Sequence, residues 1–150
     1  MTTWIEGSPL SDYLETSSDS VERERIFRRI GERPDNFSLI HADLHPENIV
    51  CNGEDLSLID FDDSAYGWHM YDIASALIED RLAPGFGALR EALLEGYREH
   101  RPLEGRDVDM LSAFLLIRGM AIIGWFHQRP EHTGSGYFEE VKNWVIAECI

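Results

Sequence analysis

Lysine is almost missing from this chain of 150 residues: its single lysine is Lys142, and Lys and Arg together number 13 against 28 Asp and Glu. The formal net charge is therefore −15. A protein that binds a nucleic-acid duplex must neutralise phosphates with basic side chains, so this balance argues against nucleic acid and anionic membranes as partners. The surplus of carboxylates suits a protein that stays in aqueous solution, or a site that takes a cationic ligand.

Cysteine and long apolar runs are also scarce. The two cysteines, Cys51 and Cys149, form no C-x-x-C pair, which argues against a disulfide framework or a zinc site built on them. The N-terminus has no basic head followed by an apolar stretch, so we expect no secretory signal. The apolar run at residues 113–117 ends at Arg118, and each such run is shorter than a membrane span requires. These features predict a cytoplasmic protein without a membrane partner.

The spacing of apolar residues predicts one domain over residues 1–150, mainly α with a small β-hairpin (α+β). Helical spacing indicates helices over residues 21–30, 70–77, 88–100, 107–127 and 137–150. Short apolar runs indicate strands over residues 37–40, 49–51 and 56–60, after which the chain is expected to be loop and helix, with Trp68 in the loop. Asn52 and Gly53 lie between the last two strands, and an Asn-Gly pair there predicts the hairpin turn.

This hairpin brings together polar residues that are separate in the sequence. Asp43 precedes Asn48 by five residues, and Asp60 follows Asn48 by twelve. Asn48 stands at the start of one arm and Asp60 at the end of the other, so antiparallel pairing places them at the same end of the hairpin. A carboxylate that orients a hydroxyl, beside an amide and a second carboxylate that hold magnesium, suits phosphoryl transfer from ATP.

The segment from His41 to Asn48, HADLHPEN, resembles the catalytic loop of the aminoglycoside phosphotransferase and choline kinase-like family, which is related to the protein kinases. Residues 59–63, IDFDD, resemble its metal-binding motif, and residues 71–74, YDIA, the helix that follows. The resemblance covers residues 35–150 and implies a protein-kinase-like C-terminal lobe that phosphorylates a small-molecule hydroxyl with ATP and Mg²⁺. Residues 1–10 resemble more loosely the segment that joins the two lobes.

The resemblance also implies a role for each polar residue of the site. Asp43 would be the catalytic carboxylate that orients and deprotonates the acceptor. Asn48 and Asp60 would bind Mg²⁺ and, through it, the nucleotide. Asp62 would either add a water-mediated metal contact or cap its own loop, and the loop-capping role is the one that we expect.

Two further residues are expected to support the site. His41 is predicted to be a buried hydrogen-bonding residue that shapes the loop, and the resemblance implies that Asp72 braces the loop from beneath. A zinc site of His41, His45 and His69 is the alternative for the histidines. Pro46 argues against it, because it favours a loop over the helix that would place the first two histidines together.

The chain departs from the family by what it lacks. A kinase of this lineage has an N-terminal lobe with a glycine-rich loop over the phosphates and a strand lysine paired with a helix glutamate. No G-x-G-x-x-G occurs here, and Lys142 falls in the last predicted helix. We therefore expect the N-terminal lobe to be absent, nucleotide binding to be weak, and this chain by itself to be a poor or inactive kinase.

Two other functions stay open at this point. A lobe that binds a small molecule or a partner without catalysis would keep the polar cluster only as architecture, and would form a homodimer through the surface that the missing lobe normally covers. A metal-dependent phosphohydrolase would use the same carboxylates and release phosphate without an acceptor. The acceptor itself is not identified, although Asp107, Asp109, Glu139 and Glu140 would favour a cationic one if they line a cleft rather than a solvated face.

Overall fold

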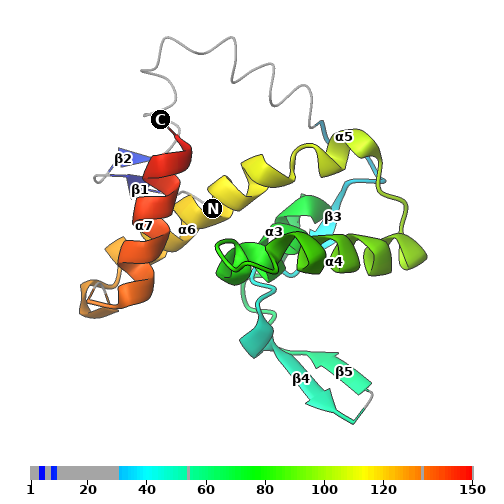
Figure 1. Ribbon diagram of the computed structural model, residues 1–150, viewed down its shortest axis with the longest axis horizontal. Coiled ribbons are helices and arrows are strands. Elements are labelled where there is room, and N and C mark those ends of the chain that lie inside the picture. The colour runs from blue at the N-terminus through cyan, green and yellow to red at the C-terminus, as the bar shows by residue number, and fades with distance from the viewer. Residues whose placement is uncertain (1–3, 6–7, 10–30, 54, 133, 150) are drawn as a thin grey trace. The chain divides into compact units, whose positions relative to one another are not determined.

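The structure is a computed structural model that describes residues 4–5, 8–9, 31–53, 55–132 and 134–149 (Figure 1). The chain divides into two compact units, one of residues 32–118 and one of residues 119–150 together with the N-terminal residues up to 31. The single domain predicted over residues 1–150 stays a prediction. The helix predicted over residues 21–30 lies outside the described residues, and in the predicted inter-lobe segment β1 (Trp4–Ile5) pairs antiparallel with β2 (Ser8–Pro9).

Helices are the main regular structure of the unit of residues 32–118. They are α3 (His69–Leu77), η2 (Ile78–Asp80), α4 (Phe86–His100), α5 (Gly105–Val108) and the first part of α6 (Leu111–His127). The helices predicted over residues 70–77 and 88–100 are confirmed to within two residues. Their apolar sides form the core of the unit, which includes the buried residues Met70, Ile73, Ala74, Leu77, Ile78, Leu94, Leu111, Phe114 and Leu115.

The prediction of one helix over residues 107–127 is wrong, because α5 ends at Val108 and α6 begins at Leu111. Between them the amide of Met110 donates to the carbonyl of Asp107 at 3.1 Å, a tighter turn than the α-helix makes. No proline or glycine marks this break. The Asp107 side chain is instead held from outside the helix, since both of its oxygens accept from Nη2 of Arg33 at 3.0 Å.

The stretch Gly105–His127 has 23 residues and is long and apolar enough to cross a membrane by length and composition alone. Each uninterrupted apolar run is too short for a membrane span, but the whole helical stretch of residues 105–127 is long enough. A mostly buried core helix of a globular protein passes the same test; here 33% of the most apolar window is buried, and the buried residues of α6 include Leu111, Phe114, Leu115, Ile122 and Phe126. Membrane binding stays outside what we predict for this chain.

The strands of the same unit form two separate two-stranded antiparallel sheets. β3 (Phe37–Ile40) pairs with β6 (Ala65–Trp68), and β4 (Ile49–Asn52) pairs with β5 (Asp55–Leu58). β6 is not predicted from the sequence, and the prediction that Trp68 lies in a loop is wrong, because Trp68 ends this strand opposite Phe37. The fold is thus mainly helical as predicted, but the described residues contain three small sheets rather than one hairpin.

The predicted hairpin is present, with its turn within residues 52–55 as expected. Asn52 is the last residue of β4 and pairs with Asp55, so both strands extend one residue further toward the turn than predicted. Gly53 lies in this turn with a φ of 66°, a conformation that glycine adopts without steric cost. β5 ends at Leu58, two residues before the predicted end, which leaves Asp60 outside the strand.

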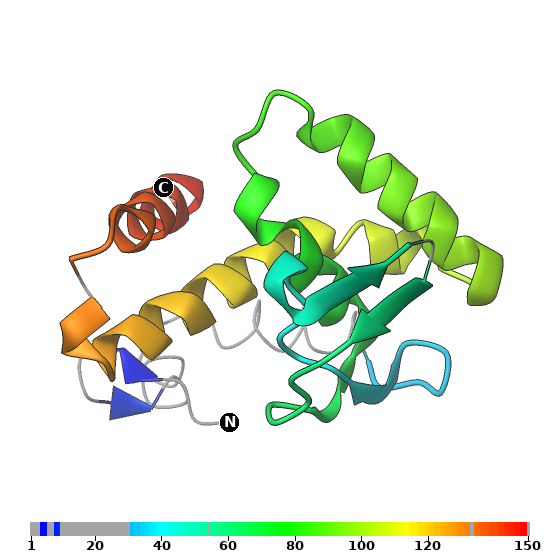
Figure 2. The same ribbon diagram turned by 90° about the horizontal axis from the view of Figure 1, so that it is seen from below.

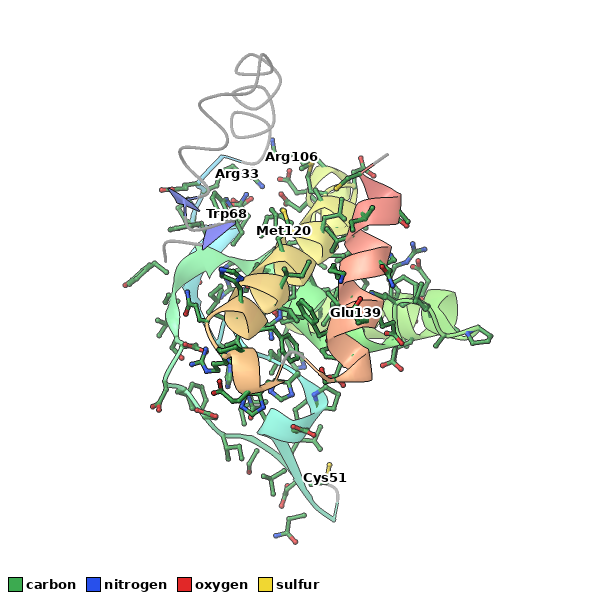
Figure 3. All side chains as sticks on the ribbon, turned by 90° about the vertical axis from the view of Figure 1, so that its left-hand side faces the viewer. Arg33, Cys51, Trp68, Arg106, Met120 and Glu139 are labelled. Atoms are coloured by element: carbon green, nitrogen blue, oxygen red, sulfur yellow. The ribbon has the colours of Figure 1, made fainter. Side chains whose placement is uncertain are left out.

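The β4–β5 hairpin extends from η1 (Pro46–Asn48) away from α3 and α4 (Figure 1), and Figure 2 shows its two strands side by side. Its register puts Ile49, Cys51, Leu56 and Leu58 on one face. Leu56 is 69% exposed and Leu58 45%. Cys51 lies on this hairpin, apart from Arg33 and Trp68 of the same unit (Figure 3). The hairpin therefore gains little stability from packing.

The second unit consists of the last part of α6, η3 (Pro130–His132) and α7 (Gly136–Glu148). The helix predicted over residues 137–150 is confirmed, with small shifts at both ends. Gly119 on α6 explains how closely the two helices pack: a Cβ atom there would lie 2.7 Å from Cγ2 of Val145 and 3.0 Å from the ring of Trp144. Ser135 caps α7, because its Oγ accepts from the amide of Phe138 at 3.2 Å.

Candidate active site

The loop between β3 and η1 is held by one carboxylate of α3. The two oxygens of Asp72 accept hydrogen bonds from the amides of His41, at 2.9 Å, and Ala42, at 2.8 Å. Ala42 is buried and has a φ of 67°, a backbone conformation that costs a non-glycine residue about 1–2 kcal/mol. Charge-assisted hydrogen bonds to successive amides offset that cost. Asp72 thus lies where a brace beneath the loop would have to lie, and its effect on activity stays a prediction.

His41 ties this loop to the metal-binding motif. The histidine is buried, its Nε2 lies 2.8 Å from the carbonyl oxygen of Ile59, and its ring packs on Phe61 at 4.7 Å between centroids. The amide of Ile59 donates in turn to the carbonyl of Asn48 at 3.0 Å. The two segments that the resemblance identifies are therefore joined through backbone and side chain. Within the described part of the chain, no group of three or more His, Cys, Asp and Glu residues is placed to hold a metal, so the alternative zinc site is not found.

Asp43 and Asn48 lie within hydrogen-bond distance of each other in the loop. Asn48 is buried, and its Nδ2 donates to the carbonyl of Asp43 at 2.9 Å and lies 3.5 Å from Oδ2 of the same residue. Nε2 of His45 is also 3.5 Å from this Oδ2. The amide nitrogen of Asn48 is thus used inside the loop, which leaves its Oδ1 as the atom available to a cation.

Arg118 completes the surroundings of Asp43 and is the residue that the sequence analysis missed. Its Nη2 donates to Oδ1 of Asp43 in a short ion pair, and its guanidinium also interacts with the phenol of Tyr71. Burial by itself lowers the pKa of Arg118, but Tyr71 and Asp43 together outweigh it and raise that pKa above its ordinary value. One feature of the sequence could have identified it: Arg118 is the single charged residue among residues 111–126.

Asp60 and Asp62 lie just beyond the hairpin and are exposed. Asp60 has a φ of 61°, so together with Ala42 the site contains both non-glycine residues of positive φ in the described part of the chain. The Asp60 carboxylate makes no hydrogen bond or ion pair with any described residue, Asp43 and Asn48 included. The convergence of all three side chains thus stays a prediction.

These donors fit magnesium. Mg²⁺ prefers hard oxygen ligands, and it typically takes one or two protein ligands while phosphate oxygens and water complete its octahedron. Oδ1 of Asn48 and the free carboxylate of Asp60 would supply such a pair, and Asp62 is exposed beside them. The loop-capping role expected for Asp62 and its alternative, a metal contact, both stay predictions.

A second buried histidine, His69, supports the helix that carries Asp72. His69 begins α3, its Nε2 lies 2.7 Å from Oγ of Ser38, and Nη1 of Arg101 lies 2.7 Å from Nε2 and 3.1 Å from Nδ1. Burial lowers the pKa of His69, and the positive charge of Arg101 lowers it further. His69 thus joins β3 and the end of α4 to the helix that carries Asp72.

The remaining candidates are engaged elsewhere. Trp68 packs on Phe37 and Phe114, with ring centroids 5.3 and 6.1 Å apart, so it is part of the core of its unit. Two of the four acidic residues that were considered for a cationic acceptor have partners within their own units: Asp107 is paired with Arg33, and Glu139 accepts from Lys142 at 2.8 Å. The solvated role expected for these acidic residues stays a prediction.

Comparison with known sequences identifies relatives over most of the chain. A family model described as "Phosphotransferase enzyme family" matches residues 10–107. The amicoumacin kinase of Bacillus subtilis (strain 168) is 31% identical over 120 residues, which are 74% of this chain and 35% of that protein. A homoserine kinase of Rhodopseudomonas palustris (strain BisA53) is 40% identical over 88 residues, which are 56% of this chain and 26% of that one. The chain thus spans about a third of the length of these relatives.

Solved structures resemble the fold over nearly all of the chain. "Amicoumacin kinase hAmiN in complex with AMP-PNP, Ca2+ and Ami" superposes with a TM-score of 0.69 at 22% identity, over 98% of this chain and 51% of that one. "Structure of the microcompartment-associated aminopropanol kinase" superposes with a TM-score of 0.66 at 26% identity, over 95% and 44%. Because the amicoumacin kinase structure is only 22% identical to this chain, its similarity shows a shared fold and nothing more.

Proposed function

Since this chain belongs to the phosphotransferase enzyme family, we propose that it supplies the acceptor-activating and metal-binding part of an ATP- and Mg²⁺-dependent small-molecule kinase. The observation that carries the proposal is the placement of Asp43, whose loop is fixed by Asp72 through two amides and by Asn48 through the Asp43 carbonyl. Phosphoryl transfer depends mainly on holding the reacting groups in position, and a rigid loop does this.

Asp43 would act on the acceptor through Oδ2. Its Oδ1 is taken by Arg118, whereas the contacts of Oδ2 with Asn48 and His45 are both 3.5 Å long, too long for strong hydrogen bonds. An acceptor hydroxyl would donate to Oδ2 and lose its proton there as the phosphoryl group is transferred. Asn48 and Asp60 would hold Mg²⁺, which when bound neutralises charge on the phosphates of ATP.

The acceptor in this proposal is a small molecule with a free hydroxyl. The names of the relatives supply the compounds to test first, which are homoserine, aminopropanol and amicoumacin. We propose that this chain alone turns over slowly, because its one lysine, Lys142, is paired with Glu139 on α7 rather than placed in a nucleotide clamp. Steady-state turnover as fast as that of a kinase with both lobes would contradict this part of the proposal.

The test separates metal-nucleotide binding from chemistry. We expect Mg²⁺ with AMP-PNP to raise the Tm of the 150-residue chain, because a ligand that binds only the folded state stabilises it. Asp60→Ala should abolish this rise, since it removes the free carboxylate that would bind the ion. Asp43→Asn should keep the rise but lose phosphoryl transfer from ATP to the acceptor, measured with radiolabelled ATP.

The matched control is Asp63→Ala, which removes an exposed carboxylate of the same segment that has no assigned role. This variant should keep both the rise in Tm and the turnover. A rise that survives in Asp60→Ala would exclude the metal site. Turnover that survives in Asp43→Asn would exclude Asp43 as the acceptor-activating residue.

A non-catalytic module is the second candidate, and the exposed apolar side chains of the strands favour it. Leu39 and Tyr66 face each other across β3 and β6 and are 65% and 77% exposed, and the apolar face of the β4–β5 hairpin is open as well. Surfaces of this kind are typical of contacts with a partner or a second copy of the chain. No rise in Tm with Mg²⁺ and nucleotide, combined with a concentration-dependent dimer in sedimentation, would favour this function over the kinase.

A further inference from the structure

Arg118 is an unusual residue for its position in the chain. It lies on α6 between apolar neighbours, and its side chain is only 15% exposed. Burying a cation among apolar side chains is costly unless the charge is paired, so an arginine at such a position needs a specific partner. That partner is the carboxylate of Asp43, 75 residues earlier in the chain and within the same compact unit.

The ion pair fixes one oxygen of the carboxylate and leaves the other. Nη2 of Arg118 donates to Oδ1 of Asp43, and Tyr71, the neighbour of Asp72 on α3, interacts with the same guanidinium. One helix therefore holds both the backbone of the loop, through Asp72, and the arginine that fixes the side chain of Asp43. Nε of Arg118 is buried and has no hydrogen-bond partner among the described residues. The guanidinium therefore binds the Asp43 carboxylate through Nη2 alone and not through two parallel hydrogen bonds.

We propose that Arg118 is a positioning residue that sets the rotamer of Asp43 and so selects Oδ2 as the oxygen that receives the acceptor hydroxyl. Arg118 acts through Asp43 and does not itself touch the reacting atoms. Arginine suits this task better than lysine, because its planar guanidinium defines a direction as well as a charge. This inference rests on the proposed function for its consequence, but the contact can be tested without turnover.

The first measurement follows the Asp43 carboxylate by NMR in the full chain labelled with ¹³C-aspartate. The Asp43 carboxyl signal is assigned by its disappearance in Asp43→Asn. We expect a single sharp signal in the wild type that shifts and broadens in Arg118→Met, because the carboxylate then samples several rotamers. Arg106→Met is the matched control, since Arg106 is exposed and paired with Glu104, and it should leave the signal unchanged.

Arg118→Lys keeps the charge and removes the planar fork, so the Asp43 signal should shift less than in Arg118→Met but should still broaden. An Asp43 signal unchanged in Arg118→Met would overturn the proposal. If Arg118→Met does not fold, as judged by the amide spectrum, Arg118→Lys decides the question. A signal identical to that of the wild type in Arg118→Lys would then overturn it.

The second measurement is kinetic. We expect Arg118→Met to lower kcat by about 10- to 100-fold, as misplacement of a catalytic group does, and Arg118→Lys to recover part of the loss. KM for the nucleotide should stay the same, because Mg²⁺ and ATP bind through other residues. Absence of turnover in the wild type, with the NMR changes as expected, would count against slow turnover by this chain alone and would support the positioning contact. An unchanged kcat in Arg118→Met would overturn the positioning role.

Discussion

The loop of residues 41–48 and the segment of residues 49–63 that follows it differ sharply in how this chain holds them. In the loop, His41, Ala42 and Asn48 are buried. Asp72 accepts hydrogen bonds from the loop backbone, and Asn48 and Arg118 donate to Asp43. In the hairpin and metal motif, every residue from 55 to 63 is exposed, and the Asp60 carboxylate has no described partner. Burial and side-chain hydrogen bonds hold the acceptor half of the candidate site, whereas the metal half is exposed and is tied to the loop through Ile59 and Phe61.

This difference indicates which part of the reaction the chain prepares by itself. A fixed Asp43 needs little reorganisation to receive a hydroxyl, so the acceptor half is organised in advance. The metal half must be ordered when the ion and the nucleotide bind, and that ordering subtracts from the binding free energy. We therefore propose that the exposed metal segment would contribute to the weak nucleotide binding that we predict, in addition to the lack of a lysine clamp among these 150 residues.

Asp72→Asn should cause the largest loss of stability among the variants that test this difference between the loop and the metal segment. Asparagine keeps one acceptor oxygen and turns an NH₂ group toward the second amide, so one buried N–H in the loop loses its partner. Hydrogen bonds to charged groups are worth about 1.5–3 kcal/mol each, so we expect a loss of roughly 2–4 kcal/mol in the free energy of unfolding. Urea denaturation measures it.

The matched control is Asp55→Asn, an equivalent change in the exposed hairpin. Surface substitutions of this kind usually change stability by less than about 0.5 kcal/mol. A loss in Asp55→Asn as large as that in Asp72→Asn would show that the hairpin is as firmly held as the loop and would remove the contrast.

The sequence predicted the hairpin and the loop because the signals for both are local. An Asn-Gly pair between apolar runs indicates a turn wherever it occurs, and here Asn52 is the last paired residue before the turn. The loop motif places Asp43 and Asn48 five residues apart, close enough for one side chain to bind the backbone of the other. Asp72 was reached through the family resemblance, and spacing alone would not have identified it.

The sequence could not predict contacts that depend on distant packing. Arg118 and Asp43 are 75 residues apart, and nothing in either segment specifies the other. Strand β6 contains Gly67 and follows an acidic turn, so its sequence does not indicate a strand. Its pairing with β3 depends on the packing of Trp68 on Phe37. The break between α5 and α6 likewise lacks a local breaker and coincides with the pairing of Asp107 with Arg33.

A smaller effect should be a pH dependence of the free energy of unfolding that arises from His69. The pKa of His69 is lowered in the folded chain, first by burial and then by Arg101, while Asp72 and Asp107 oppose the shift. The unfolded chain therefore takes up this proton more readily than the folded one. Stability from His69 is complete above the ordinary pKa of 6.5 and falls as the pH drops from 6.5 through the lowered value.

Urea unfolding at pH 7.5 and at pH 5.5 tests this expectation. The loss of stability between the two pH values should become smaller in Arg101→Met, because one of the two causes of the lowered pKa is then removed. His69→Gln should remove the contribution altogether, whereas His100→Gln, which changes an exposed histidine, should leave the wild-type dependence. A pH dependence that is identical in wild type and His69→Gln would assign it to other groups.

The smallest effect should be a gain, and it should occur in the metal segment. Asp60 holds a φ of 61° on an exposed residue, a conformation that glycine adopts without the steric cost of a Cβ atom. We expect Asp60→Gly, measured without metal, to raise the free energy of unfolding by about 0.5 kcal/mol, the lower end of such backbone relief.

The control is Asp62→Gly, because Asp62 is also exposed but does not have a positive φ. There the added chain entropy of glycine should lower stability by roughly 0.5 kcal/mol. The two variants should also differ in the response to Mg²⁺ with AMP-PNP: Asp60→Gly should lose it while gaining stability, which is the relation expected where a strained residue is retained for binding. A loss of stability in Asp60→Gly equal to that in Asp62→Gly would mean that the backbone at Asp60 stores no strain, and the metal segment would then be open without being strained.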